Sequence, residues 1–425
     1  MDRIIADLRK LVEINSVSAR TEQKECPFGV GVRKVLDTAL DICGSYGFRT
    51  KNCDNMIGYA ETGQGEELMG ILVHLDVVPA GDGWNYEPFA LTVEDGKLIG
   101  RGVTDDKGPA AAVIHAIREL LEEGCVFNKR IRIIFGMTEE AGDWIDMEYY
   151  KQTEEKIDFG FTPDADFPAI YAEMGIANVR FTFDRTRTCF EDIEGGNAVN
   201  MVPDICRARF RSESGEILSM TETGKSAHGS TPQDGENAIS KLMTCFQTRE
   251  DCQLSSFFRD CIKMEYHGES LNGYAADKES GEITYNFGMI RTDGDTISLT
   301  ADIRYPVTFR IEDILEQIRK HMTSSGYGDV KMELLYNEPY VFLEEDGPVI
   351  TKLLEAYREH TGDMGRATVI GGGTYARAME NIVAFGPMLP GRELTEHQAN
   401  EYMFIEDLRL AKDIYKSAIR KLAAE

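Results

Sequence analysis

Two apolar runs separated by a helical segment constrain the fold of this chain more than any other feature. The runs are LMGILVHLDVV (68–78) and IRIIFGM (131–137), and PAAAVIHAIRELLEEG (109–124) between them has the spacing of a helix that ends at Gly124. Runs this apolar are typical of strands that are covered on both faces. The three segments together predict a layered α/β fold with a largely buried sheet.

Length and charge restrict the number of domains and the kind of partner. A chain of 425 residues favours two domains, each large enough to bury its own core. The 46 Lys+Arg against 73 Asp+Glu give a formal charge of −27, without a compensating basic run, so a phosphate backbone would be repelled. We therefore expect no nucleic-acid partner.

The sequence also indicates where the protein resides. No stretch reaches the roughly 20 apolar residues that a membrane span requires. The first 15 residues, MDRIIADLRKLVEIN, suit an amphipathic helix and not a signal peptide. Nine cysteines are spread along the chain without a Cys-x-x-Cys pair, as is typical of reduced, mostly structural thiols. We expect a cytoplasmic protein that does not bind membranes.

Metal-ligand residue types follow the predicted buried runs. The segments HLDVVP, GRGVTDDKG, TEEAG and PDADFP lie at strand ends or just after them, where open α/β sheets place ligands, and LTEHQANEY follows near the end of the chain. The candidate residues in these five segments are His74, Asp76, Asp105, Glu139, Glu140, Asp164 and His397.

Each segment alone is weak, but the set favours a metal centre. A single His-x-Asp is more often structural, and adjacent glutamates usually lie on a solvated surface. Carboxylates that directly follow apolar strands are costly unless they are paired or metal-bound. Two imidazoles and three carboxylates suit a pair of divalent ions, with zinc foremost and manganese or cobalt as alternatives. One of Glu139 and Glu140 could ligate while the other serves as a base, and Asp76 could hold the His74 imidazole.

The second half of the chain has a different pattern. Its alternating strands and two helices predict an inserted α+β domain over 178–338, and a helix, a Gly-rich turn, a strand and a last helix return the chain to the first domain, 1–177 and 339–425. The expected elements are strands 179–183, 205–211, 296–305 and 383–387, and helices 232–247, 311–324 and 348–360.

Nine motifs in order resemble the M20 family of co-catalytic zinc peptidases, closest to its PepV-like dipeptidase branch. They are HLDVVPAGDGW, GRGVTDDKGP, TEEAGDW, PDADFP, NMVPD, GKSAHGSTP, ADIRYPV, GGGTYAR and HQANEY, and they run over nearly the whole chain. The resemblance implies a zinc-peptidase-like catalytic domain, with a mixed sheet flanked by helices, and an inserted α+β lid domain. It also implies that Asp105 bridges two ions, completed by His74 and Asp164 at one site and by Glu140 and His397 at the other.

The resemblance assigns roles beside the ligands. Glu139 would be the general base, Asp76 would orient a ligand, and the peptide bond after Asp105 would be cis. In the inserted domain, His228 would polarise the scissile carbonyl, whereas without the resemblance it reads as a surface histidine. The other implied contacts to substrate are Asn200 as a companion donor, with Asn197 as a neighbouring alternative, Arg304 on a substrate carboxylate, and Gly373 and Thr374 in GGGTYAR, which lacks the ending of a P-loop.

These observations predict a metal-dependent dipeptidase. In the family, aspartate at the position of Asp164 accompanies amino- and dipeptidases, whereas glutamate accompanies deacylases and carboxypeptidases. The alternative within the family is a deacylase or desuccinylase of N-acyl amino acids, and Arg304 favours dipeptides over it. A metal-free binding or regulatory homologue would need a broken ligand position, and none of the five is broken. The resemblance to the PepV-like branch, whose enlarged lid supplies its histidine in cis, implies a monomer, and the insertion here is long enough to supply His228 in this way.

Overall fold

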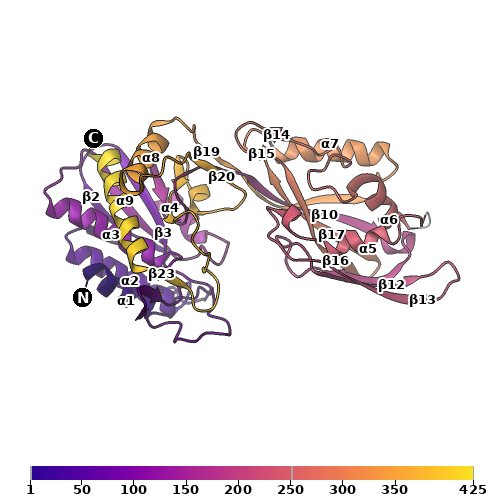
Figure 1. Ribbon diagram of the computed structural model, residues 1–425, viewed down its shortest axis with the longest axis horizontal. Coiled ribbons are helices and arrows are strands. Elements are labelled where there is room, and N and C mark those ends of the chain that lie inside the picture. The colour runs from indigo at the N-terminus through magenta and orange to yellow at the C-terminus, as the bar shows by residue number, and fades with distance from the viewer. Residues whose placement is uncertain (1, 250–251, 425) are drawn as a thin grey trace. The chain divides into compact units, whose positions relative to one another are not determined.

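The chain divides into two compact units. The computed structural model describes residues 2–249 and 252–424 (Figure 1). The first unit comprises the residues up to Tyr171, Leu343–Thr368 and the residues from Thr374 onward, and the second comprises Ala172–Phe342 and Val369–Gly373. We predicted the second domain over 178–338, and the second unit also contains 172–177, 339–342 and the glycines of the GGGTYAR turn.

A mixed sheet forms the centre of the first unit. Strand β3 (Leu68–His74) is buried at every position and pairs in parallel with β6 (Arg130–Gly136) and β7 (Phe159–Thr162). The sheet order is β1-β2-β6-β3-β7-β21, and β9 pairs with β21 beyond it. The outer strands are β1 (Arg49–Cys53) and β2 (Ile57–Gly63), both antiparallel to their neighbours, β21 (Ile382–Ala384), parallel to β7, and β9 (Ile170–Glu173).

Helices flank this sheet, as predicted. Helix α3 (Lys107–Glu122) connects β3 to β6 and is buried along almost its whole length because it packs against other helices as well as β3 (Figure 1). The remaining helices are α1 (Arg3–Val12) and α9 (Ile405–Ala423), which both pack on α3, α8 (Pro348–Thr361) on α9, α2 (Val30–Ser45) on β1 and β2, and α4 (Ile145–Thr153). The predicted amphipathic helix at the N-terminus and the βαβ arrangement of 68–137 are confirmed.

Short strands complete the first unit and the segments through which the chain passes from one unit to the other. They are β4 (Thr92–Glu94), β5 (Lys97–Ile99) and β23 (Tyr402–Phe404) in one small sheet, β8 (Ala165–Asp166) with β22 (Pro387–Met388), and β19 (Val341–Phe342) and β20 (Thr368–Ile370), which both pair with β9. The predicted strand 383–387 is shorter than expected, since β21 ends at Ala384 and β22 begins only at Pro387.

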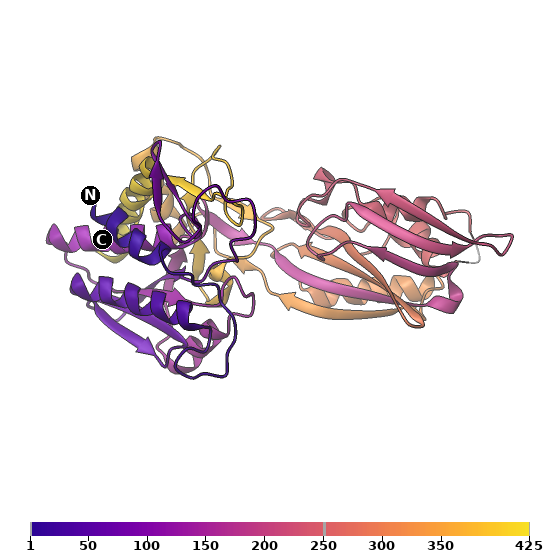
Figure 2. The same ribbon diagram turned by 90° about the horizontal axis from the view of Figure 1, so that it is seen from below.

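The second unit is an antiparallel sheet with helices packed on one face (Figure 2). The sheet order is β13-β12-β11-β16-β17-β10-β18, and apolar side chains of the strands and of three helices form its core. The elements are β10 (Gly175–Asp184), β11 (Phe190–Gly195), β12 (Ile205–Arg211), β13 (Ile217–Thr223), β16 (Thr284–Asp293), β17 (Thr296–Tyr305), β18 (Lys331–Glu338), the hairpin β14 (Ala276–Asp277) and β15 (Gly281–Glu282), and the helices α5 (Ala238–Thr244), α6 (Gln253–Phe257) and α7 (Ile311–Ser324).

The helix predicted over 232–247 is wrong in its first part. A 3-10 turn, Pro232–Asp234, is followed by Gly235 in extended backbone, which interrupts the helical path. Helix α5 then begins at Ala238, because the Asn237 side chain accepts a hydrogen bond from Ser240 N at 3.0 Å and caps it. The sequence pattern therefore located the helix but missed its start.

Most of the cysteine side chains are buried. Seven of the nine cysteines are buried, while Cys125 is partly exposed and Cys245 exposed. Burial of most of the thiols agrees with the structural role expected for them. Within residues 2–249 and 252–424, none of the helices has both the length and the apolar character needed to cross a membrane.

Candidate metal centre

The structure brings the five predicted ligands together in the first unit. They form two groups, His74–Asp105–Asp164 and Asp105–Glu140–His397, and within each group the ligand atoms lie within 4.8 Å of one another. Asp105 belongs to both groups. Each group adds one imidazole and one further carboxylate to the shared Asp105, and these are donor types that divalent cations accept.

The sheet explains why residues so far apart in sequence meet. His74 is the last residue of β3, Glu140 follows β6, and Asp164 follows β7. These three strands are parallel neighbours, so their carboxyl ends lie at one edge of the sheet. Asp105 lies just before α3, and His397 lies in the loop before β23. His74, Glu140 and Asp164 therefore lie near one another at this edge of the sheet.

The two imidazoles lie close to different oxygens of the shared Asp105 carboxylate. His74 Nε2 lies 2.7 Å from Asp105 Oδ1, and His397 Nε2 lies 2.9 Å from Asp105 Oδ2. His74 Nε2 is also 3.8 Å from Asp164 Oδ2, and His397 Nε2 is 3.1 Å from Glu140 Oε1. Each imidazole therefore faces two carboxylates through its Nε2 atom.

The donor atoms have the chemistry that a divalent cation requires. His74 Nδ1 lies 3.0 Å from the carbonyl oxygen of Asp76, so the neutral ring donates there and carries its lone pair on Nε2. His74 Nε2 and Asp105 Oδ1 are both buried, and among the described residues neither has a hydrogen-bond partner. Two buried electron-pair donors that face each other at 2.7 Å need a positive charge between them, so the residues fit a metal ion.

Without metal, protons take the place of this positive charge. Burial opposes a charged His74, but the Asp105 carboxylate raises the pKa of its imidazole well above the usual value. Hydrogen bonds to Asp105 and Glu140 raise the pKa of His397 to about 11. Burial, together with the charge of Asp105, raises the pKa of Asp164 to about 7. The group thus retains protons at neutral pH that a bound cation would displace.

Asp76 contacts the segment that carries Glu139 and Glu140 as well as the imidazole of His74. Its carboxylate accepts hydrogen bonds from the backbone N–H of Glu139 at 3.3 Å and of Glu140 at 3.1 Å. The nearer oxygen of this carboxylate is 3.6 Å from His74 Nδ1, which is longer than the contact of Nδ1 with the Asp76 carbonyl. The side chain of Asp76 therefore orients the segment that carries both glutamates.

Glu139 lies beside the ligand groups without belonging to either of them. Burial raises the pKa of its carboxyl group well above the usual range, and the carboxylates of Asp164, Glu140 and Asp105 add to this effect. A carboxylate that is adjacent to the ligands but not engaged by them is suited to accept a proton.

Two buried acids near the centre were not singled out from the sequence. Asp106 accepts a hydrogen bond from His74 N at 3.1 Å, and the peptide bond between Asp105 and Asp106 is cis, as the family resemblance predicted. Asp146 accepts from Thr138 N at 3.1 Å and from the Tyr375 hydroxyl at 2.8 Å. The pair of acids in TDDKG and the two acids in GDWID were visible, but the sequence contains no sign of which ones are buried.

The substrate-binding residues predicted in the inserted domain belong to the second unit. His228 Nδ1 accepts a hydrogen bond from Ser230 N at 3.3 Å and lies 2.7 Å from the Ser230 hydroxyl. The proton of the neutral ring is therefore on Nε2. Burial, followed by the charge of Arg304, lowers the pKa of His228, which favours the neutral form. The backbone N–H of Gly229 donates to Asn200 O at 2.7 Å, so the predicted companion Asn200 lies beside the His228 loop.

Arg304 is buried and held in place, which excludes the solvent-facing orientation. Its Nε and Nη2 atoms donate to Asp302 Oδ2 at 3.0 and 2.9 Å, and Nη1 donates to the Gly371 carbonyl. A guanidinium has five N–H donors, so two have no partner among the described residues. Gly373 is exposed in the same turn as Gly371, and Thr374, assigned to the first unit, accepts a hydrogen bond from Ala376 N at 3.1 Å.

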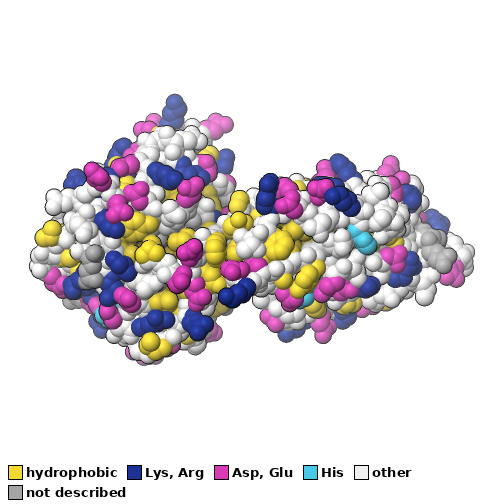
Figure 3. All heavy atoms as spheres, turned by 90° about the horizontal axis from the view of Figure 1, so that it is seen from above, with side chains coloured by type: hydrophobic (Ala, Val, Ile, Leu, Met, Phe, Trp, Pro, Cys, Tyr) yellow, Lys and Arg dark blue, Asp and Glu magenta, His cyan; other side chains and the backbone are white. Residues whose placement is uncertain are grey.

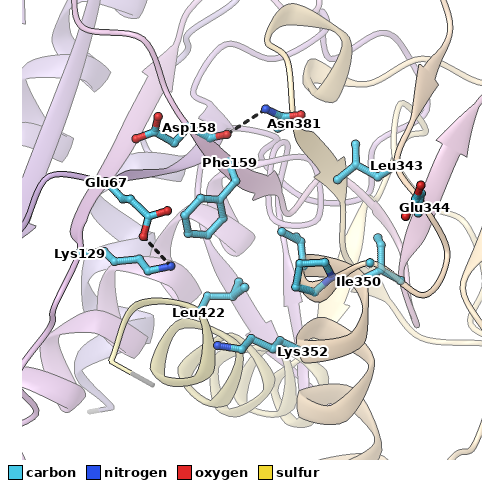
Figure 4. Close-up of a pocket in the computed structure, with 13 residues that line it drawn as sticks. Glu67, Lys129, Asp158, Phe159, Leu343, Glu344, Ile350, Lys352, Asn381 and Leu422 are labelled. Atoms are coloured by element: carbon cyan, nitrogen blue, oxygen red, sulfur yellow. Dashed lines mark hydrogen bonds and ion pairs between the residues drawn. The ribbon is translucent and has the colours of Figure 1, made fainter.

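A separate pocket in the first unit lies away from the two ligand groups. A pocket of about 420 Å³ lies at the amino-terminal ends of β3, β6 and β7, at the sheet edge opposite the ligands (Figure 4). Four of its polar side chains, Lys129, Asp158, Lys352 and Asn381, contact other protein groups, as in the ion pair of Lys129 with Glu67 at 3.0 Å. The face in Figure 3 shows basic side chains interspersed with acidic ones, which is unlike a nucleic-acid interface.

The remaining histidines have the structural or surface positions that were expected. His115 is buried and lies 3.0 Å from Asp7 Oδ2. His267 Nδ1 lies 2.7 Å from the Ile283 carbonyl, and His321 and His360 lie on α7 and α8.

An α/β fold that gathers two imidazoles and three carboxylates, three of these side chains at or just after the ends of parallel strands, has the donor set of a metal-dependent hydrolase. The chain matches Peptidase family M20/M25/M40 over residues 70–421, and it belongs to this family. The predicted family membership is confirmed.

Individual relatives cover the whole chain. A protein of Staphylococcus haemolyticus named "Putative dipeptidase SH1171" is 36% identical over an alignment of 468 residues, which covers 100% of this chain and 97% of the relative. Among solved structures, human carnosine dipeptidase 1 has a TM-score of 0.63 at 17% identity and covers 99% of this chain and 96% of that one. The dipeptidase Dug1p of Saccharomyces cerevisiae has a TM-score of 0.60 at 15% identity, covering 99% and 95%. At these identities, the two solved structures show a similarity of fold alone.

Proposed function

We propose that this chain is a metal-dependent dipeptidase, which hydrolyses the peptide bond of dipeptides or short peptides. The observation that carries the proposal is the pair of ligand groups that share Asp105. Relatives named as dipeptidases along the full length of the chain support a peptide substrate.

The proposed cofactors are two divalent cations, with zinc foremost and manganese or cobalt as alternatives. His74, Asp105 and Asp164 would hold one cation, and Asp105, Glu140 and His397 would hold the other. One imidazole and two carboxylates at each position suit zinc, which accepts nitrogen and oxygen ligands together. Cations at these positions would lower the pKa of a bound water and draw charge from the scissile carbonyl oxygen.

Glu139 is the proposed general base. Its carboxylate would take a proton from the attacking water and deliver it to the leaving nitrogen. Positive charge at the two ligand groups would favour the ionised form of Glu139, which burial alone disfavours. Asp76 supports this role, since it fixes the backbone of the glutamate turn at two N–H groups.

His228 is proposed to stabilise the developing oxyanion. The tautomer that Ser230 selects carries the proton on Nε2, and the lowered pKa keeps the ring neutral, so His228 presents one N–H donor at neutral pH. Such a donor is worth most where charge appears during the reaction. Asn200 is proposed as its companion donor, and the backbone of Gly373 with Thr374 as further contacts of the substrate.

Arg304 is proposed to bind the free carboxylate of the substrate. Its two remaining N–H groups can bind a carboxylate, while the contacts with Asp302 and Gly371 hold the guanidinium still. This contact suits dipeptides and N-acyl amino acids alike, and the aspartate at position 164 is what favours dipeptides. We also propose that the protein acts as a monomer in the cytoplasm.

Substrate competition tests the proposed class. Purified protein with zinc should hydrolyse a free dipeptide, and an unlabelled dipeptide should compete better than its N-acetylated form. Preferential cleavage of the N-acetylated compound would instead indicate the deacylase. Absence of both activities in a protein that contains two equivalents of metal would contradict the proposed hydrolase.

A further inference from the structure

A buried glutamate outside both ligand groups contacts the segment that carries the shared ligand. Glu401 lies directly before β23, only 1% of its surface is exposed, and it follows the ligand His397 by four positions. Both oxygens of its carboxylate accept hydrogen bonds from protein groups, so we assign it no catalytic role.

The two carboxylate oxygens of Glu401 accept hydrogen bonds from donors in one short segment. Oε2 accepts from Gly102 N at 3.0 Å and from Arg101 Nη1 at 2.8 Å. Oε1 accepts from Thr104 N at 2.9 Å and, at 3.4 Å, from Asp105 N. Three backbone N–H groups between residues 102 and 105 therefore converge on a single carboxylate. Since Asp105 ends this run, the carboxylate fixes the backbone from which the shared ligand projects.

Backbone contacts attach Glu401 itself to the same region. Its carbonyl oxygen accepts a hydrogen bond from Gly100 N at 3.0 Å, and β23, which follows it, pairs with β5. Glu401 thus connects two parts of the chain that both carry ligands. A rigid connection of this kind matters for metal binding, because partners that orient a ligand usually change metal affinity 10–100-fold when they are lost.

We infer that Glu401 is a positioning residue for the metal centre, which holds the Asp105 carboxylate in the orientation that both cations need. The inference rests on the proposed function in that it assumes two cations that share Asp105. It also explains why a carboxylate occupies this buried position. An amide could accept through only one of its two ends, and its NH₂ group would face backbone N–H donors.

The experiment is a zinc titration of the complete protein, with the two dissociation constants measured by competition against a chromophoric chelator. Glu401→Gln keeps the size of the side chain and should weaken both cations by about 10–100-fold. Glu406→Gln, at an exposed carboxylate on α9 that pairs with Arg392, is the matched control and should bind zinc normally. His397→Ala should weaken chiefly the cation held by Glu140 and His397.

The outcomes separate this inference from the proposed function. If wild type fails to bind two cations, the proposed function fails. If wild type binds two and Glu401→Gln binds them equally well, the inference alone is overturned. Weakening of only the cation near His397 would also overturn it, because Glu401 would then act through the His397 loop and not through Asp105.

A second variant guards against simple unfolding. Glu401→Asp keeps the charge but is one methylene shorter, so it should retain part of the affinity that Glu401→Gln loses. Circular dichroism and thermal melting of the metal-free variants give their folded fraction at the titration temperature. If Glu401→Gln does not fold, the titration of folded Glu401→Asp decides: weaker binding of both cations supports the inference, and unchanged binding overturns it.

Discussion

His397 Nε2 lies 2.9 Å from Oδ2 of Asp105, while the other oxygen of the same carboxylate faces His74. In the metal-free protein this contact holds a proton, since hydrogen bonds to Asp105 and Glu140 raise the pKa of His397 to about 11. The same geometry that binds a metal therefore also binds protons, and the two must compete.

Metal affinity should consequently rise with pH. Hydrogen bonds to Asp105 and Glu140 raise the pKa of His397 to about 11, and the Asp105 carboxylate raises the pKa of His74, so protons compete with metal for these rings between pH 6 and 8. Each displaced proton should increase the apparent affinity about tenfold per pH unit. Titration calorimetry in buffers of different ionisation enthalpy would measure the proton release. Affinity that does not change with pH over this range would show that the imidazoles are not the ligands.

Removal of metal should abolish hydrolysis and lower thermal stability together. A cation that binds only the folded state stabilises it by about 2.7 kcal/mol when its free concentration is a hundred times its Kd. Treatment with a chelator followed by melting should show the loss, and addition of zinc, manganese or cobalt should show which ion restores activity. Full activity in protein shown by elemental analysis to be metal-free would contradict the proposed mechanism.

Glu139→Gln should retain its metal and lose turnover. The variant keeps all five ligands, whereas loss of a general base typically lowers kcat by about 10²–10⁴-fold. Metal content by elemental analysis and kcat with a dipeptide would be measured on the same preparation. Glu140→Gln is the matched comparison, because the substitution alters a ligand and should reduce metal content. If the two variants behave the other way round, their roles must be exchanged.

The sequence was most informative at positions where only a few residue types can bind a metal. His74, Asp105, Glu140, Asp164 and His397 could be predicted because ligand chemistry and the family motifs restrict each position, and the structure brings them into two groups. The parallel strands could be predicted as well, since a run such as β3 is apolar at nearly every position and must be covered on both faces.

Supporting contacts were beyond sequence reasoning for a physical reason. Glu401 has its role because three backbone N–H groups point at it, and no side-chain pattern encodes the direction of a backbone amide. Asp76 was expected to act on His74, but its carboxylate also holds Glu139 and Glu140, which follow a different strand. The start of α5 was missed because Gly235 and the Asn237 cap act locally against the helical pattern.

His228→Ala and Arg304→Ala should affect different kinetic constants. Loss of an oxyanion donor typically lowers kcat by about 10²–10³-fold, with a modest change in KM. Loss of charge-assisted hydrogen bonds to a substrate carboxylate should mainly raise KM, by about 10–100-fold. Steady-state kinetics with one dipeptide would compare the variants. A near-normal kcat in His228→Ala would show that His228 is a surface histidine with no part in the reaction.

Mixing two inactive variants tests whether one chain supplies the whole active site. Glu139→Gln carries an intact second unit, and His228→Ala carries an intact first unit. If the protein acts as a monomer, each molecule lacks one essential group and the mixture should stay as inactive as its components. If His228 serves the site of a neighbouring chain, a mixed dimer contains one site with both Glu139 and His228, and up to about a quarter of wild-type activity should return by random association. Sedimentation of the wild-type protein gives the oligomeric state independently. Recovered activity together with a dimeric mass would overturn the proposed monomer, while leaving the assignment of His228 to the reaction intact.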